Sequence, residues 1–185
     1  MIKEVQSSTE KKMKSSVEAL KHDLATIRTG RASVSVLDGI TIDYYGTPTP
    51  LNQVAKLGVP EPTLITVQPF DPSIAQAIER AIQKADLGLN PANDGKLIRV
   101  PIPPLTEERR KQLAKKAGQM AEGGRTALRQ IRRDANEEIK ELEKDGKISQ
   151  DDEKRALEEI QKLTDRHVTL VEEVLKAKEK DILEF

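Results

Sequence analysis

Arginine recurs along one stretch of the chain at helical spacing. Arg125, Arg129 and Arg132 are followed by Asn136 at steps of four, three and four residues, and Arg133 adjoins them. On an α-helix, residues at these steps share one face. A planar guanidinium can bond two phosphate oxygens at once, and a rigid helix holds several of them in fixed positions. The stretch is therefore a candidate nucleic-acid-binding face.

The same arginines have an ordinary alternative role. Helical bundles rich in charge commonly pair arginine with Glu and Asp of neighbouring helices, and spacing alone does not decide between the two roles. Further basic residues lie upstream, at Arg109, Arg110, Lys111, Lys115 and Lys116. They add basic density, although runs of charge are usually solvated faces.

Catalytic chemistry finds little support. The two histidines, His22 and His167, lie on or beside apolar helical stripes, where packing is the commoner role. The acidic pairs Glu107-Glu108 and Asp151-Asp152 fall in first turns of predicted helices, where the helix dipole favours carboxylates. Cysteine is absent, as are the GxxxxGK[ST], GxGxxG, GxSxG and HExxH motifs. We expect no catalytic residue, no metal site, no cofactor and no enzymatic activity.

Composition divides the chain into two zones. All ten prolines lie between Pro48 and Pro104. Charged residues make up 34% of the chain and aromatic residues only 2%, which is typical of long solvated helices. The first residues, MIKEVQSSTEKKMK, have no apolar core, so we expect neither a signal peptide nor a membrane span. A soluble, cytoplasmic protein without disulfides fits these features.

Outside the proline-containing zone, apolar residues recur at steps of three and four. A first helix should end near Gly30, a second should start after the N-cap Thr106 and close at Gly146, and a third should start at the N-cap Ser149. The first stripe is Ile2, Val5, Thr9, Met13, Val17, Leu20, Leu24 and Ile27. The second is Leu113, Ala117, Met120, Leu128, Ile131, Ala135, Ile139 and Leu142. The third is Ala156, Ile160, Leu163, His167, Leu170, Val174 and Ala177.

Two adjacent glycines interrupt the second stripe. Each of Gly123 and Gly124 costs a helix about 1 kcal/mol relative to alanine. Their position predicts either a close approach of another helix or a bend, and the sequence does not choose between them.

The middle zone follows a different period. Ile40, Ile42 and Tyr44 alternate with polar neighbours like a half-buried strand, and GTPTP at 46–50 has turn chemistry. Residues 63–68 and 97–100 also predict strands. A short helix is expected at about 72–86, with Ile74, Ala77, Ile78, Ala81 and Ile82 buried.

Together these patterns predict an α+β fold: an elongated antiparallel three-helix bundle with a small β/α/β domain inserted between its first and second helices. The bundle comprises residues 1–30 and 105–185, and the insert comprises residues 31–104. The chain must cross between them twice. The crossings, at Gly30-Arg31 and at Pro103, Pro104 and Leu105, predict a hinge whose prolines limit its range of angles.

Several motifs in fixed order resemble the bacterial ribosome recycling factor family. They are IRTGRAS (27–33), YYGTPTPL (44–51), DLGLNP (86–91), RVPIPPLTEERRK (99–111) and IRRDAN (131–136). The resemblance extends from about residue 2 to residue 185. Only Gly123-Gly124 departs from it, being richer in glycine than we expect for that helix.

The resemblance implies a function. Such a factor binds the post-termination ribosome and, with elongation factor G and GTP, promotes subunit separation and reuse of ribosomes, while hydrolysing nothing itself. The bundle would contact large-subunit ribosomal RNA through Arg129 and Arg132. The smaller domain and hinge would face elongation factor G. Weaker correspondences are Arg28, Arg31, Arg110 and Arg133, beside the spacing-derived Arg125. We expect a monomer without membrane contact.

One alternative from a different class remains at this stage. A charged three-helix bundle does not itself specify RNA, so the chain could be a helical protein-interaction or chaperone-like module. Salt-dependent RNA binding would distinguish the two.

Overall fold

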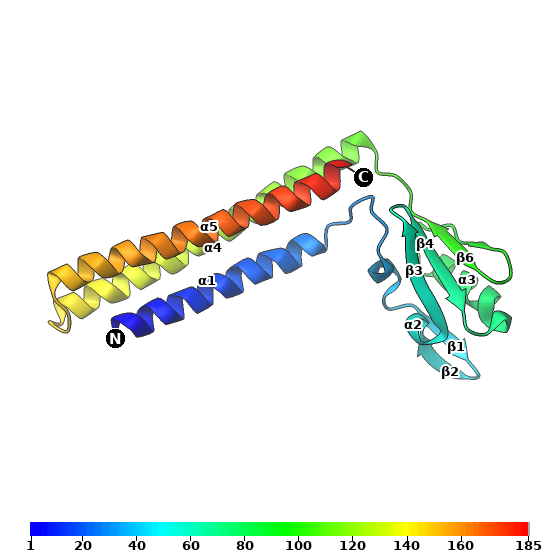
Figure 1. Ribbon diagram of the computed structural model, residues 1–185, viewed down its shortest axis with the longest axis horizontal. Coiled ribbons are helices and arrows are strands. Elements are labelled where there is room, and N and C mark those ends of the chain that lie inside the picture. Colours follow the sequence, from blue (N-terminus) through cyan, green and yellow to red (C-terminus); the bar gives the residue numbers. More distant parts are fainter. Residues whose placement is uncertain (185) are drawn as a thin grey trace. The chain divides into compact units, whose positions relative to one another are not determined.

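The computed structural model describes residues 1–184 and contains long helices and small antiparallel sheets (Figure 1). The chain forms two compact units, one of Met1–Arg28 with Glu107–Glu184 and one that begins at Thr29 and runs to Thr106. The junctions lie two residues from the expected positions. A helical bundle with an inserted α+β unit is the predicted fold class, which is thereby confirmed.

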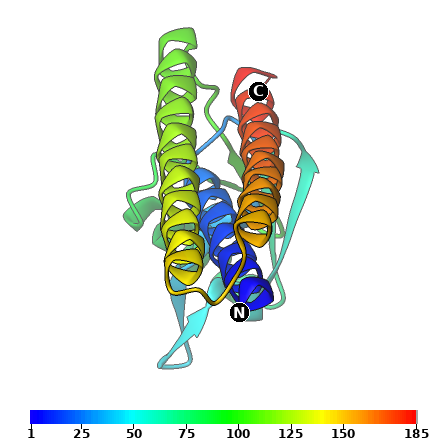
Figure 2. The same cartoon turned by 90° about the vertical axis from the view of Figure 1, so that its left-hand side faces the viewer.

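The bundle unit consists of α1 (Ile2–Ala25), α4 (Glu107–Lys144) and α5 (Gln150–Glu184). α1 runs alongside α5 and antiparallel to α4, and it packs against both (Figures 1 and 2). Each helix carries a buried stripe along one side, so none could bury its apolar face without the other two.

The α1 stripe is buried as its period predicts, apart from half-buried Ile2. The helix ends at Ala25, before the expected end near Gly30. At this end, the N–H and the hydroxyl of Thr26 both donate hydrogen bonds to Asp23 O, at 3.1 and 2.6 Å. His22 is exposed, so packing was the wrong expectation for it. His167 is buried, and its Nδ1 lies 2.7 Å from Leu163 O.

A tight connection joins α4 to α5. Gly146 adopts φ +69°, and the Lys147 N–H donates to Leu142 O at 2.9 Å, which closes α4 in a Schellman-type turn. Ser149 then caps α5: its Oγ accepts the Asp152 N–H at 3.1 Å and donates to Asp152 Oδ2 at 2.8 Å. The hydrogen bond from the Ser149 hydroxyl, together with one from the Ser149 N–H to the same carboxylate oxygen at 3.4 Å, lowers the pKa of Asp152. Both helix ends are those that Gly146 and Ser149 predict.

The stripe of α5 differs from the predicted one in its middle. The buried face passes through Thr164, Val171 and Leu175, whereas Leu170 is 38% exposed. The predicted stripe contains Leu163, Leu170 and Val174. Each of these lies one position before the residue that is buried. Thr164 can be buried because its hydroxyl donates to Ile160 O at 2.8 Å within the same helix.

The paired glycines of α4 have separate roles. α4 continues through both of them from Glu107 to Lys144. A Cβ built on Gly124 would lie 3.0 Å from Leu20 Cδ2 of α1, whereas a Cβ on Gly123 would meet nothing within 4 Å. Of the two alternatives that the sequence left open, the structure shows a close approach, and of the two glycines only Gly124 takes part in it.

The inserted unit contains two antiparallel sheets. The larger has the order β3 (Ala55–Glu61), β4 (Leu64–Pro69), β6 (Ile98–Pro101) and β5 (Ala92–Asn93). β3 escapes sequence inspection because Gly58 and Pro60 interrupt it, but it is an edge strand, where proline is tolerated. The smaller sheet is a hairpin of β1 (Thr41–Tyr44) and β2 (Thr47–Pro50).

The hairpin corrects one prediction. The turn comprises only Tyr45 and Gly46, with φ +50° and +81°, and residues 47–50 form a strand instead of a turn. Positive φ at both central residues is the geometry of a two-residue hairpin loop. Two short helical segments, Val34–Leu37 and α2 (Leu51–Val54), flank the hairpin.

Helix α3 (Ala75–Lys84) packs with both sheets around a core of aliphatic side chains. A single turn, Pro72–Ile74, precedes it and is capped by Asp71, whose Oδ1 accepts the Ser73 N–H at 2.9 Å. Ile78 and Ile82 are fully buried, as predicted, whereas Ala77 is exposed. The core residues include Ile40, Ile42, Ile65, Val67, Ile78, Ile82, Ile98 and Val100.

Both connecting segments are fastened to the same turn of the inserted unit. The Ala32 N–H donates to Pro62 O at 2.6 Å, and the Ile102 N–H donates to Thr63 O at 2.8 Å. Pro62 and Thr63 are the residues between β3 and β4. The incoming and outgoing chains therefore share one anchor within this unit.

The two glycines of α4 should respond differently to substitution. Gly123→Ala should raise the free energy of unfolding by about 0.5–1 kcal/mol, because alanine favours helix and its methyl meets open space. Gly124→Ala should give no comparable gain, because its methyl displaces Leu20. Urea unfolding followed by circular dichroism measures both, and equal stabilisation would contradict the assigned close approach.

Candidate nucleic-acid interface

The continuous helix α4 holds the predicted arginines in fixed register, but their side chains differ in exposure. Arg129 is 56% exposed, whereas Arg125 is 19% exposed. Arg132 is half-buried and Arg133 is exposed. The face that spacing predicts is therefore a graded surface, on which Arg125 and Arg132 are partly buried and Arg129 and Arg133 are exposed.

Arg125 ties two helices together. Its Nε donates to Glu172 Oε1 of α5 at 2.7 Å, and its Nη1 donates to Glu122 Oε2 of α4 at 2.6 Å. These hydrogen bonds, first the one to Glu172, raise its pKa. With two carboxylates on one guanidinium, Arg125 has the ion-pairing role that charge-rich bundles favour.

Glu122 is shared between two arginines. Its Oε1 accepts a hydrogen bond from Arg129 Nη1 at 3.2 Å, in addition to the bond from Arg125. The Arg125 hydrogen bond is the largest cause that lowers the pKa of Glu122. A lowered folded-state pKa means that this interaction stabilises the fold above the carboxylate's ordinary pKa. The contribution is lost as pH falls through the lowered value.

Arg132 has a neutral partner. Its Nη1 donates to Gln161 Oε1 of α5 at 3.1 Å, and Gln161 Nε2 in turn donates to Asp165 Oδ1 at 2.8 Å. Within residues 1–184, neither Arg132 nor Arg133 forms an ion pair. Their positive charge is therefore not neutralised by a contacting carboxylate, and the bond to Gln161 orients the Arg132 guanidinium.

The remaining candidates lie elsewhere in the chain. Arg110, in the first turn of α4, donates through Nη1 to Leu183 O near the end of α5 at 3.0 Å. Arg28 is exposed at the last position of the first bundle segment, and Arg31 is exposed in the inserted unit. Five of the seven predicted arginines therefore lie on α4, four of them between Arg125 and Arg133, and Arg28 and Arg31 lie outside this helix.

Sequence reasoning missed Gln161 as the residue that orients Arg132. Its signal is weak, because a polar residue next to buried Ile160 resembles any boundary position of a helix. Asn136, one turn beyond Arg132, carries a buried Oδ1 without a hydrogen-bond partner in the described part of the chain. Asn136, the last residue of the predicted series, is therefore partly buried in the bundle.

No group of three or more His, Asp or Glu side chains is arranged to hold a metal ion in residues 1–184. In the same range no helix is both long and apolar enough to cross a membrane.

Comparison with known proteins gives a consistent result. Residues 20–183 match the ribosome recycling factor family. Ribosome-recycling factors from Desulfosudis oleivorans and from Legionella pneumophila strain Paris are 53% and 54% identical to this chain, with all of both chains covered. A solution structure of a ribosome recycling factor superposes with a TM-score of 0.73 at 41% identity, covering 100% of this chain and 98% of that one.

A second solved structure includes partners. It describes T. thermophilus ribosome recycling factor and E. coli elongation factor G bound to the E. coli post-termination complex. Its matching chain is 45% identical to this one, with 99% of both chains covered and a TM-score of 0.63.

Fold and surface define a class: a two-unit protein whose helical bundle presents arginines from one long helix. Sequence identity over the full length then specifies it. The chain belongs to the ribosome recycling factor family, whose members are non-enzymatic factors of protein biosynthesis.

Arg125 and Arg129 should contribute differently to stability. Arg125→Ala should lower the free energy of unfolding by about 1–2 kcal/mol, because it removes two charge-assisted hydrogen bonds and leaves Glu172 without this partner. Arg129→Ala should change it by less than about 0.5 kcal/mol, since its pair is exposed. Thermal and urea unfolding of the two variants measure this, and similar losses would contradict the assigned difference.

Proposed function

We propose that this chain binds the post-termination ribosome and, with elongation factor G and GTP, promotes separation of the subunits and release of ribosomes for reuse. The observation that carries the proposal is membership of the ribosome recycling factor family along the whole chain. The related structure bound to a post-termination complex with elongation factor G supports the choice of partners.

In this proposal the bundle, expected as 1–30 and 105–185, is the unit that contacts large-subunit ribosomal RNA. In the described part of the chain, residues 1–184, no carboxylate contacts Arg132 or Arg133, and Arg129 shares one carboxylate at the surface. Such guanidinium groups suit phosphate oxygens. Arg125 contributes mainly by holding α5 beside this face, while Arg28, Arg31 and Arg110 are outlying cations.

The second part of the proposal concerns the two crossings. Gly30, Arg31, Pro103, Pro104 and Leu105 form the hinge, and the insert, residues 31–104, is the part that faces elongation factor G. Supporting this choice, hydrogen bonds fasten the chain to one turn of the insert at Ala32 and Ile102, which leaves the hinge residues between that anchor and the bundle helices. Rotation at these residues would change the interdomain angle without disturbing either core.

The factor is proposed to act as a cytoplasmic monomer. Ribosomes are its substrate, and the absence of cysteine is compatible with a reducing compartment. The alternative of a helical interaction module without an RNA role receives no support from the relatives, which are all named as ribosome-recycling factors.

A direct assay tests the central proposal. Post-termination ribosomes are incubated with this protein, elongation factor G and GTP, and subunit separation is followed by light scattering. Separation should require all three components, because the protein hydrolyses nothing itself. Equal separation without the protein would reject the proposal.

Arg129 and Arg132 should contribute to binding more than to folding. Arg132→Ala and Arg129→Ala should each weaken ribosome binding about tenfold and reduce the slope of log affinity against log salt by about one, because each loses a phosphate contact. Helix content and melting should stay nearly unchanged. The matched control is Arg166→Ala, which removes an exposed arginine from α5.

Wild-type affinity in both α4 variants would refute the role of these two arginines. Equal weakening by Arg166→Ala would indicate that overall charge, and not this face, determines binding.

Distortion of the hinge should separate binding from splitting. Gly30→Pro restricts φ at one crossing, and Pro103→Gly with Pro104→Gly loosens the other. Both changes should slow subunit separation by elongation factor G more than they weaken ribosome binding, because these segments are the covalent links between the insert and the bundle. Filter binding and light scattering measure the two steps. Wild-type splitting rates in both variants would show that hinge mechanics are not part of the mechanism.

A further inference from the structure

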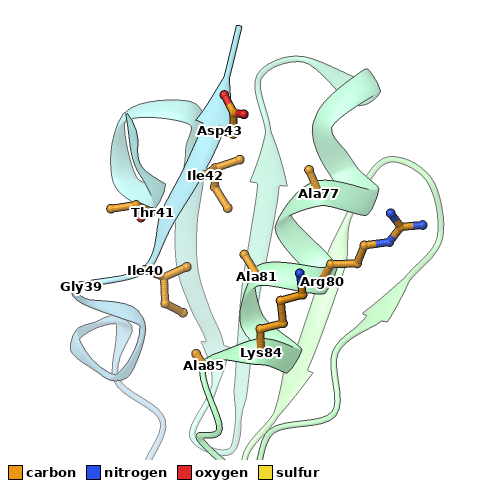
Figure 3. Close-up of a pocket in the computed structure, with 10 residues that line it drawn as sticks. All are labelled: Gly39, Ile40, Thr41, Ile42, Asp43, Ala77, Arg80, Ala81, Lys84 and Ala85. Carbon is orange, nitrogen blue, oxygen red and sulfur yellow. The ribbon is translucent and has the colours of Figure 1, made fainter. Parts of the chain in front are cut away.

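A groove lies within the inserted unit, between strand β1 and helix α3 (Figure 3). It has a volume of about 510 Å³. One wall is the stretch from Gly39 to Asp43, and the other is formed by Ala77, Ala81 and Ala85 with the two cations of α3. The strand and the helix run in opposite directions along it, so that Asp43 lies near the Ala77 end and Gly39 near the Ala85 end.

The strand wall has an open backbone edge. β1 pairs only with β2, in the register Thr41↔Pro50, Ile42↔Thr49, Asp43↔Pro48 and Tyr44↔Thr47. In an antiparallel pair, residues alternate between exchanging hydrogen bonds and pointing them away. Proline cannot donate, so Ile42 and Tyr44 form the bonded pairs. The N–H and C=O groups of Thr41 and Asp43 therefore point away from β2, and both residues line the groove.

The two edges of this hairpin differ in whether they can accept another strand. On β2 the outward positions are occupied by Pro48 and Pro50, which offer no N–H and so block the addition of another strand. β1 has no proline, and its outward positions, Thr41 and Asp43, keep their donors. The outer edge is thus protected against strand addition, while the edge beside the groove is not.

The helix wall leaves room for a chain. Ala77, Ala81 and Ala85 recur every four residues on the side of α3 that lines the groove. Ala77 is exposed, and the other two are half-buried. A methyl at each position lets an extended backbone approach the helix beside β1, where larger side chains would fill the space.

The two ends of the groove carry opposite charges. Arg80 and Lys84 are exposed, and within residues 1–184 neither forms an ion pair. Lys84 lies at the end opposite Asp43, which is the single carboxylate among the lining residues; Arg80 extends away from β1 (Figure 3). An acidic side chain entering the groove would therefore be favoured near Lys84 and disfavoured near Asp43.

We propose that this groove binds an extended acidic segment of a partner protein, which adds as a further strand to the open edge of β1. The segment places small or β-branched apolar side chains against the alanine wall and its acidic residue beside Lys84. Main-chain hydrogen bonds to Thr41 and Asp43 supply affinity, and the charge supplies direction. The site belongs to the inserted unit alone and does not depend on the arginines proposed to bind RNA.

The test uses the full chain, labelled with ¹⁵N, and a short synthetic peptide. The peptide is acetylated and amidated, alternates valine and threonine, and ends in two glutamates. Binding should shift the amide resonances of Thr41, Asp43, Ala77 and Ala81, and it should slow hydrogen exchange at Thr41 and Asp43. A peptide with lysine in place of glutamate should bind about fivefold more weakly.

Substitutions in the chain separate the backbone and charge contributions. Asp43→Pro removes one outward donor, as Pro48 does on the partner strand, and should abolish the protection at Thr41. Lys84→Glu should weaken the acidic peptide about fivefold or more, whereas Lys96→Glu, an exposed lysine outside the groove, should leave it unchanged. Ala77→Phe should block binding, and Gln83→Phe, on the same helix but not in the groove, should not.

Several results would overturn the proposal. They are the absence of shifts at Thr41 and Asp43, equal affinity for the acidic and basic peptides, or equal effects of Lys84→Glu and Lys96→Glu. Amide spectra of each variant without peptide establish that the inserted unit remains folded. Because Arg129 and Arg132 lie on α4, failure here leaves the ribosome-binding proposal standing, and the reverse also holds.

Discussion

Mutual burial of three apolar stripes is the constraint on which the bundle depends. α1 contacts both long helices, and its Leu20 side chain fits against the backbone of α4 only because position 124 has no side chain. The bundle has few aromatic residues with which to fill gaps, and at position 124 the Leu20 side chain fills the space against the α4 backbone. The register of α1 against α4 in turn determines which side of α4 remains at the surface.

The arginines on that surface of α4 differ in whether their charge is paired within the bundle or is available to a binding partner. Arg125 lies between two carboxylates, one of them on α5, so its charge is used within the bundle. Arg132, two turns further along the helix, meets the amide of Gln161 and keeps its charge. A difference of partner, and not of residue type, therefore separates an arginine that holds helices together from one that suits a phosphate.

The inserted unit shows the same principle in its backbone. Prolines protect the outer edge of the hairpin, and the opposite edge faces a groove lined by small side chains. Edge strands generally need such protection against unwanted pairing. The unprotected edge of β1 lies beside α3, whose Arg80 and Lys84 form no ion pair within residues 1–184. The two edges of the hairpin therefore differ in whether they can accept another strand.

Local sequence was sufficient for much of the fold. Helix ends with specific chemistry, such as Gly146 and Ser149, lie where the chain predicts them, because their hydrogen bonds involve only neighbouring residues. The alternating strand at Thr41–Tyr44 was likewise evident, and the family followed from ordered motifs. Beyond these local signals, the tertiary structure decided the outcome. It buried Thr164 in place of Leu163, made a strand of 47–50, and gave carboxylate partners to Arg125 but not to Arg132. The strand at 47–50 depends on its pairing with Thr41–Tyr44. The burial of Thr164 and the Arg125–Glu172 pair depend on contact with other helices, and spacing along a single helix does not contain that information.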